Sequence, residues 1–330
     1  MFKTRLIATG SYLPEKTLTN EEIIRRAEVF NGAPATLAPE KVVQVIGAVE
    51  RREAREDQSC SDLIVEAARS TLDAAGVKPG KLDRIFVSST PGDFFEPSTA
   101  SVVQYKLGAT CPAIDIRASC VGWLAGLDYA FHRVDRAEDR LVLVLAGTKI
   151  GRIGVENPFH RCIFGDGAGG ALVAPSDKEQ VKATYFWTGG EYHDVIVMPH
   201  GHSIRPAGVP PDYDGRFYMG DRETIFGALK KYLPDSLATL FAKSGCATGD
   251  IDYAFIHQAS GPIFEETVKI CGLPSGKIHR DYEHYGNTIS AELPISLDNA
   301  VRNGKVSTDD TILLATYGAG FTGGGIVLDY

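Results

Sequence analysis

The sequence predicts an α/β protein that contains the same structural unit twice. The segment at residues 72–86 aligns without a gap with the segment at 241–255, and each indicates a helix end, a capping glycine, a turn and a buried strand. A strongly apolar strand follows in each half, at 141–146 and at 311–316. Near-continuous apolar strands that alternate with helices are typical of mostly parallel sheets covered on both faces. We therefore expect an internal duplication.

Both halves are expected to contain the same elements in the same order. In the first half these are a helix that ends at Gly76, a strand up to Phe86, a helix, a second helix after Cys120, the strand at 141–146 and a last strand at 165–173. In the second half they are a helix that ends at Gly245, a strand at 253–256, a helix, a second helix after Asn287, the strand at 311–316 and a last strand at 318–328.

The boundary between the halves is placed near Ser176, so that the chain divides into residues 1–175 and 176–330. The stretch at 182–211 is rich in glycine, histidine and proline, and it predicts loop and short strands near this junction. A second loop is expected at 30–41.

Composition argues against several classes of protein. The chain has 330 residues, of which 44% are hydrophobic and 23% charged, which is enough for a large core. Its net charge of −8 argues against nucleic acid or an anionic membrane as an obligate partner. No run of about 18 apolar residues predicts a transmembrane helix, and the N-terminus lacks the apolar core of a signal peptide. We expect a cytoplasmic protein with reduced thiols.

No motif predicts a metal or a cofactor. The six cysteines are too few for a disulfide scaffold and show no zinc-type pairing. Two segments, 165–170 and 318–323, match G-x-G-x-x-G, but each opens an apolar strand, whereas a dinucleotide site requires the motif to open a helix.

Three residues at the ends of apolar runs suggest nucleophilic catalysis. Cys120 stands where a short apolar run gives way to a helical segment, and the positive end of a helix dipole favours a thiolate. His257 ends the apolar run at 253–256, and Asn287 precedes a helical stretch in Gly-Asn-Thr. A nucleophile, an imidazole and an amide at three strand ends suggest acyl transfer through a covalent intermediate.

Taken singly, each of the three has a simpler explanation. Cys120 could be a small buried hydrophobic residue, His257 a structural histidine, and Asn287 a turn or cap residue. The duplication strengthens the functional interpretation, because Cys120 and Asn287 fall at corresponding points of the two halves. Pseudo-twofold symmetry would bring the strand ends together on one side of the sheets, where α/β sheets hold ligands.

The segments around Cys120, Gly165, His257, Asn287 and Gly318 together resemble the thiolase superfamily. More closely, they resemble the β-ketoacyl-acyl carrier protein synthase III (ketosynthase III) family, over nearly the whole chain. This resemblance implies a five-layer αβαβα fold and a homodimer. It also implies an acyltransferase that uses no cofactor and takes acyl-CoA or acyl carrier protein thioesters, with a malonyl thioester as extender.

The resemblance assigns a role to each site residue. It implies that Cys120 is acylated, and that His257 and Asn287 bind the thioester carbonyl of the malonyl unit and promote its decarboxylation. The backbone N–H groups of Cys120 and Ala319 would form the oxyanion hole. Two neutral donors can stabilise an enolate oxygen without competing as bases.

The chain departs from the family pattern where the family contacts the nucleotide or docks carrier protein. Lys41 and Val45 stand where acyl-CoA users have Trp and Arg, and Ser260 and Pro262 stand where they have Asn and Arg. We therefore expect altered CoA recognition, or its replacement by carrier protein.

A further departure concerns the residue that, in the family, often reaches the partner's acyl tunnel. This residue is commonly aromatic, and here it is Glu96, with Phe95 adjacent. Together the departures favour specialised metabolism over housekeeping fatty-acid initiation. Lys41, Phe95, Glu96 and Ser260 are the candidate tunnel or gate residues.

Three functions are compatible with these residues. The first is decarboxylative Claisen condensation through Cys120. The second is acyl transfer from Cys120 to an oxygen or nitrogen acceptor, with His257 as general base and no decarboxylation. The third is a non-catalytic synthase subunit, which the presence of Cys120 disfavours. The sequence names neither the acyl donor nor the acceptor.

Overall fold

The computed structural model describes residues 2–31, 38–150, 158–197 and 218–330. Its strands form two principal mixed sheets. The first sheet has the order β1 (Thr4–Tyr12), β7 (Gly167–Pro175), β6 (Val142–Thr148), β4 (Arg84–Ser89) and β5 (Ala113–Asp115). The second has the order β11 (Tyr253–Ile256), β12 (Thr311–Gly318), β13 (Thr322–Asp329) and β8 (Val181–Thr188).

Strand directions show that the two sheets repeat one another. In the first sheet β4 runs parallel to β6, and β6 runs antiparallel to β7. In the second sheet β11 runs parallel to β12, and β12 runs antiparallel to β13. The outer strands β1 and β8 then pair antiparallel with β7 and β13. The internal duplication predicted from sequence is therefore present in the fold.

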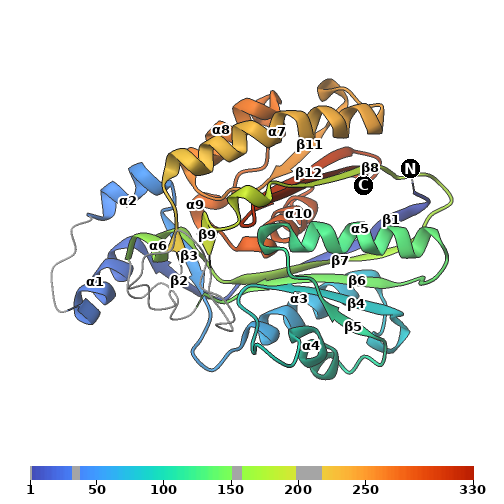
Figure 1. The fold of residues 1–330 in the computed structure, drawn as a ribbon. Helices are drawn as coiled ribbons and strands as arrows, with labels where there is room; N and C mark the ends of the chain where they lie inside the picture. Colours follow the sequence, from blue (N-terminus) through green and yellow to red (C-terminus); the bar gives the residue numbers. More distant parts are fainter. Residues whose placement is uncertain (1, 32–37, 151–157, 198–217) are drawn as a thin grey trace.

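Helices complete five layers (Figure 1). Between the sheets lie α5 (Gly122–Asp135) and α10 (Glu292–Arg302), whose apolar side chains share one core with both sheets. On the outer face of the first sheet lie α3 (Cys60–Ala75) and α4 (Thr99–Leu107). On the outer face of the second lie α7 (Arg222–Ser244) and α8 (Gly261–Cys271). This αβαβα order confirms the predicted fold class.

The two outer helices α3 and α7 begin and end through the same kinds of contact. Ser59 and Asp62 form a reciprocal capping box at the start of α3. At the start of α7, the side chain of Asp221 accepts the N–H of Thr224. Gly76 and Gly245 end the two helices with φ of 64° and 70°, a left-handed conformation that favours glycine. The structure therefore confirms the glycine-capped helix ends that the sequence predicted.

Further helices and short strands lie at one end of the two sheets (Figure 1). They include the helices α1 (Asn20–Asn31), α2 (Pro39–Ile46), α6 (Pro158–Ile163) and α9 (Tyr282–Tyr285), and the strands β2 (Lys16–Thr19), β3 (Glu50–Glu53), β9 (Ile196–Val197) and β10 (Tyr218–Met219). The short 3-10 helices are η1 (Pro79–Lys81), η2 (Ser119–Val121), η3 (Gly190–Tyr192), η4 (Thr248–Asp250), η5 (Ser275–Lys277) and η6 (Ile289–Ala291).

Two predicted loops differ from the structure. The stretch at 30–41 was predicted as loop, but α1 extends to Asn31 and α2 begins at Pro39; residues 32–37 lie outside the described ranges. In the stretch at 182–211, β8 is a full eight-residue strand whose backbone pairs with β13. The length of a strand depends on its pairing with a distant strand, and such pairing leaves no pattern in the nearby sequence. For this reason the sequence predicted only loop and short strands there. Residues 198–211 lie outside the described ranges.

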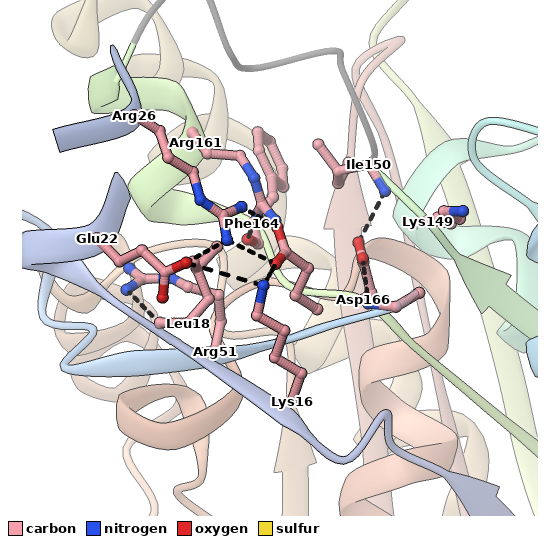
Figure 2. A network of polar contacts seen from close by, with 12 residues as sticks. Lys16, Leu18, Glu22, Arg26, Arg51, Lys149, Ile150, Arg161, Phe164 and Asp166 are labelled. Atoms are coloured by element: carbon pink, nitrogen blue, oxygen red, sulfur yellow. Dashed lines mark hydrogen bonds and ion pairs between the residues drawn. The ribbon is translucent and has the colours of Figure 1, made fainter. Parts of the chain in front are cut away.

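A network of charged side chains holds β2, β3, α1 and α6 together (Figure 2). Glu53 lies at its centre, with Lys16 at 2.7 Å, Arg26 at 2.6 Å and Arg161 at 3.5 Å. Burial would raise the pKa of Glu53, but hydrogen bonds from Arg26 and Lys16 outweigh burial and lower it to about 2. Arg51, on the same strand as Glu53, is fully buried and donates to Oδ1 of Asn20 at 2.6 Å and to the carbonyl of Cys162.

We expect Arg51→Ala to lower the free energy of unfolding by about 2–5 kcal/mol, because it opens a cavity and leaves two buried acceptors unsatisfied. Urea denaturation measures the change. Arg52→Ala is the matched control: Arg52 is less buried, and its side chain donates to the carbonyls of Pro14 and Glu15. Its expected cost is about 1 kcal/mol or less. Equal losses in the two variants would contradict this prediction.

Candidate active site

Cys120 lies in a strained turn at the start of a central helix. Ser119 has a φ of 48°, an uncommon value for a residue other than glycine, and the 3-10 turn η2 leads directly into α5. A Cβ on Gly122 would lie 2.0 Å from Oγ of Ser88, so only glycine fits there. The hydroxyl of Thr316, near the end of β12, donates to the carbonyl of Cys120 at 3.3 Å. The thiol is half-buried, whereas Cys60, Cys111, Cys162 and Cys271 are buried.

The end of β12 approaches Cys120 closely. A Cβ on Gly318 would lie 3.0–3.1 Å from the Cβ, backbone nitrogen and Sγ of Cys120. Glycine at this position therefore allows the backbone that leads to Ala319 to pass beside the thiol.

His257 follows β11 and is held by the same end of β12. Its backbone N–H donates to the carbonyl of Ala315 at 2.9 Å, and its residue is only 1% exposed. The ring of Tyr317 meets the imidazole edge-on, with the ring centres 5.4 Å apart. Nδ1 of His257 lies 2.7 Å from Oε2 of Glu292.

Asn287 is buried and its amide has a fixed orientation. Its Oδ1 accepts the N–H of Ile289 at 2.7 Å, and its Nδ2 donates to the carbonyl of Ala259 at 3.3 Å. An amide nitrogen carries two hydrogens, so one Nδ2–H remains for a ligand. Ala259 lies two residues after His257, so this hydrogen bond connects Asn287 to the loop between β11 and α8 that contains His257. The structure thus brings Cys120, His257 and Asn287 together around the end of β12.

The duplication relates these residues differently from the sequence-based expectation. Ser119 and Ile289 both have positive φ, at 48° and 55°, and each opens a 3-10 turn that continues into a central helix. In this register Cys120 corresponds to Ser290, and Asn287 lies three residues before that point. The prediction that Cys120 and Asn287 are equivalent was therefore wrong. The backbone turn, which sequence similarity did not reveal, sets the register.

The duplication also points to a candidate residue that the sequence patterns did not reveal. The alignment of 72–86 with 241–255, continued by two residues, pairs Ser88 with His257, and the register of the 3-10 turns pairs Gly122 with Glu292. In the first half, Gly122 packs directly against Ser88. In the second half, both positions carry larger side chains, and Glu292 contacts His257. The available signal was a lone carboxylate within the apolar run that begins at Ile289, at the position that pairs with Gly122.

The charges of His257 and Glu292 influence each other. Burial would lower the pKa of His257, but Glu292 and the neighbouring Cys120 outweigh burial, so the pKa of His257 is raised. Burial raises the pKa of Glu292, and His257 only partly opposes it.

The candidate tunnel residues do not form one group. Lys41 is exposed on α2, and Ser260 is half-buried at the start of α8; these helices approach each other where Gly47 meets Gly261. Phe95 and Glu96 are exposed on the loop between β4 and α4, and Figure 1 shows α4 on the other side of the molecule from α2 and α8. The structure thus brings Lys41 and Ser260 into one region and leaves Phe95 and Glu96 apart from it.

The described residues lack two kinds of feature. No group of three or more His, Cys, Asp or Glu side chains is arranged there to hold a metal ion. Within the same ranges, no helix combines the length and apolar character needed to cross a membrane.

A doubled α/β unit with two central helices between mixed sheets defines a thiolase-fold protein. Residues 114–190 match the family model described as 3-oxoacyl-[acyl-carrier-protein (ACP)] synthase III, and residues 241–330 match the model of its C-terminal part. The β-ketoacyl-[acyl-carrier-protein] synthase III of Laribacter hongkongensis is 33% identical over 333 residues, covering 99% of each chain. The chain belongs to the β-ketoacyl-[acyl-carrier-protein] synthase III family of condensing enzymes, as its sequence resemblance indicated.

Solved structures agree with this assignment. The 3-oxoacyl-[acyl-carrier-protein] synthase III of Aquifex aeolicus superposes with a TM-score of 0.88 at 28% identity, covering 99% of this chain and 100% of that one. A priming β-ketosynthase of a polyketide biosynthetic pathway superposes with a TM-score of 0.87 at 28% identity, covering 98% of this chain and 96% of that one.

Proposed function

We propose that this protein transfers an acyl group to Cys120 and then condenses it with a malonyl-type thioester, with loss of carbon dioxide. The observation that carries the proposal is the meeting of Cys120, His257 and Asn287 at the end of β12. A thiol nucleophile beside two hydrogen-bond donors provides the groups that both half-reactions need.

In the first half-reaction, the sulfur of Cys120 attacks the carbonyl carbon of the acyl thioester. The backbone N–H groups of Cys120 and Ala319 stabilise the negative oxygen of the tetrahedral intermediate. The donor's carbon–sulfur bond then breaks, the proton given up by the Cys120 thiol passes to the departing thiolate, and the acyl group remains on Cys120.

In the second half-reaction, the malonyl thioester loses carbon dioxide as its carbon–carbon bond breaks. The electron pair moves to the thioester oxygen, where His257 and Asn287 donate hydrogen bonds to the enolate. The enolate carbon then attacks the acyl group, a carbon–carbon bond forms, and the sulfur of Cys120 leaves.

Intact-protein mass spectrometry after exposure to a panel of acyl thioesters tests the first step, and carbon dioxide release from a labelled malonyl thioester tests the second. The proposal requires both. Acylation followed by transfer to an alcohol or amine without carbon dioxide would instead establish O- or N-acyl transfer. Absence of acylation by every donor would favour a non-catalytic subunit.

We also propose a homodimer. Tyr105, Ile114 and Tyr129 are exposed on α4, β5 and α5, and β5 forms an edge of the first sheet. An exposed edge strand flanked by apolar side chains is a suitable surface for a second copy of the chain. Light scattering coupled to size-exclusion chromatography gives the mass; a monomer at micromolar concentration would contradict this.

We expect a donor carried by acyl carrier protein to give a higher kcat/KM than the same acyl group on CoA. Val45 and Pro262 cannot pair with phosphate, and the loss of two charge-assisted contacts weakens nucleotide binding. Arg51 does not replace them, because it is fully buried and bound to Asn20. Equal or better use of the CoA donor would show that other cations bind the phosphates.

A further inference from the structure

The carboxylate of Glu292 takes part in none of the steps proposed above. It is the first residue of α10 and only 3% exposed. Oε1 accepts the backbone N–H of Gln258 at 2.5 Å. Oε2 lies 2.7 Å from Nδ1 of His257, which is an ion-pair distance, and neither atom has a partner with hydrogen-bond geometry among the described residues. Among the described residues, this contact is therefore the polar interaction that each of the two atoms makes.

The contact at Nδ1 determines whether the other ring nitrogen, Nε2, carries a proton. The pair is neutral overall with an imidazolium beside a carboxylate, or with an imidazole protonated at Nε2 beside a carboxylic acid. A third neutral arrangement, an imidazole protonated at Nδ1 beside a carboxylic acid, would set two hydrogens against each other in the 2.7 Å contact, because Oε1 already accepts from Gln258. The first two arrangements differ only in which side of the Nδ1–Oε2 contact holds the shared proton, and Nε2 carries a proton in both. Loss of the Nε2 proton would leave a net negative charge in a buried site, which is costly.

The other titratable groups that the described residues place around the pair do not supply a balancing positive charge. Cys120 faces His257 from η2, while Asp281 lies near Glu292 and accepts from Nε2 of Gln258 at 3.0 Å. Tyr282 and Tyr317 are the buried phenols that interact with Glu292. A neighbouring carboxylate and thiol make a further negative charge still less favourable, so they favour the protonated form of Nε2.

We propose that Glu292 is a positioning residue that keeps a proton on Nε2 of His257, so that His257 acts as a hydrogen-bond donor and not as a general base. The inference rests on the condensation proposed above, because an enolate oxygen needs a donor. It also distinguishes the two leading functions: O- or N-acyl transfer with His257 as base would need an unprotonated Nε2.

Nitrogen NMR of protein labelled with ¹⁵N in its eight histidines reports the state of each ring nitrogen. The signal of His257 is identified by its loss in His257→Asn. In the wild-type protein without substrate, we expect Nε2 to stay protonated well above the ordinary histidine pKa of about 6.5. An unprotonated Nε2 at neutral pH would overturn the proposal. This measurement needs no turnover, so its outcome is independent of whether the condensation is correct.

Substitutions at Glu292 separate the positioning role from a merely structural one. In Glu292→Gln, the amide oxygen can still accept from Gln258, so the amide nitrogen points at Nδ1 and favours the neutral ring with Nε2–H. We expect this variant to release carbon dioxide within about tenfold of wild type, whereas Glu292→Leu should lose about 10²–10³ while Cys120 is still acylated. Equal losses in the two variants would contradict the proposal.

The pH dependence gives a second readout. As pH rises, the wild-type pair loses its Nε2 proton and decarboxylation should fall. In Glu292→Gln the ring is already neutral and its Nε2–H does not ionise in this pH range, so this alkaline fall should disappear. An unchanged alkaline fall would overturn the proposal. Asp298→Asn is the matched control, because Asp298 is a buried carboxylate on the same helix that binds Thr9 and Ser11. It should leave the His257 signals unchanged.

Discussion

Replacement of Cys120 with alanine or serine should abolish acyl transfer completely. Cys120 is the thiol that the described residues place at the end of β12, and a serine hydroxyl is a far weaker nucleophile without an activating base. Intact-protein mass spectrometry gives the extent of acylation, and peptide mapping of the wild-type acyl-enzyme gives its position. Label on any other cysteine would overturn the mechanism.

Cys246→Ser serves as the matched control for this prediction. Cys246 is also half-buried, but it lies just after α7 in the outer layer, where its backbone N–H donates to Ser244. We expect this variant to be acylated at the wild-type rate. A loss of acylation in the control would show that the assay reports folding and not the nucleophile.

Replacement of Asn287 should separate the two half-reactions. Asn287→Ala removes the Nδ2–H that is free for a ligand, so we expect Cys120 acylation to continue while malonyl decarboxylation falls about 10²–10³-fold. Single-turnover acylation and carbon dioxide release, measured on the same preparation, give the two rates. Unchanged condensation would return Asn287 to the role of a turn residue.

Two further variants make this test sharper. Asn287→Asp keeps the oxygen that accepts from Ile289 but removes the donor, so it should show the same division between acylation and decarboxylation. Asn303→Ala alters an exposed asparagine at the end of α10 and should leave both half-reactions unchanged. A decarboxylation rate near wild type in Asn287→Asp would show that the donor is not used.

The sequence by itself determined the repeated architecture, because its signals are local. Gly76 and Gly245 cap equivalent helices through their own backbone conformation, and the apolar runs at 141–146 and 311–316 are buried wherever the strands pair. The chemical character of Cys120, its place before a helix and the family resemblance were likewise visible in short segments of the chain.

Only the tertiary structure decided how those segments meet. Glu292 is 35 residues from His257 in the sequence, and the two touch because β11 and α10 belong to neighbouring layers. The register of the duplication likewise depends on the positive φ values of Ser119 and Ile289. These two residues are chemically dissimilar, so a comparison of the sequences does not align them. Contacts between layers and strained turns depend on the packing of distant elements, so no local pattern in the sequence specifies them.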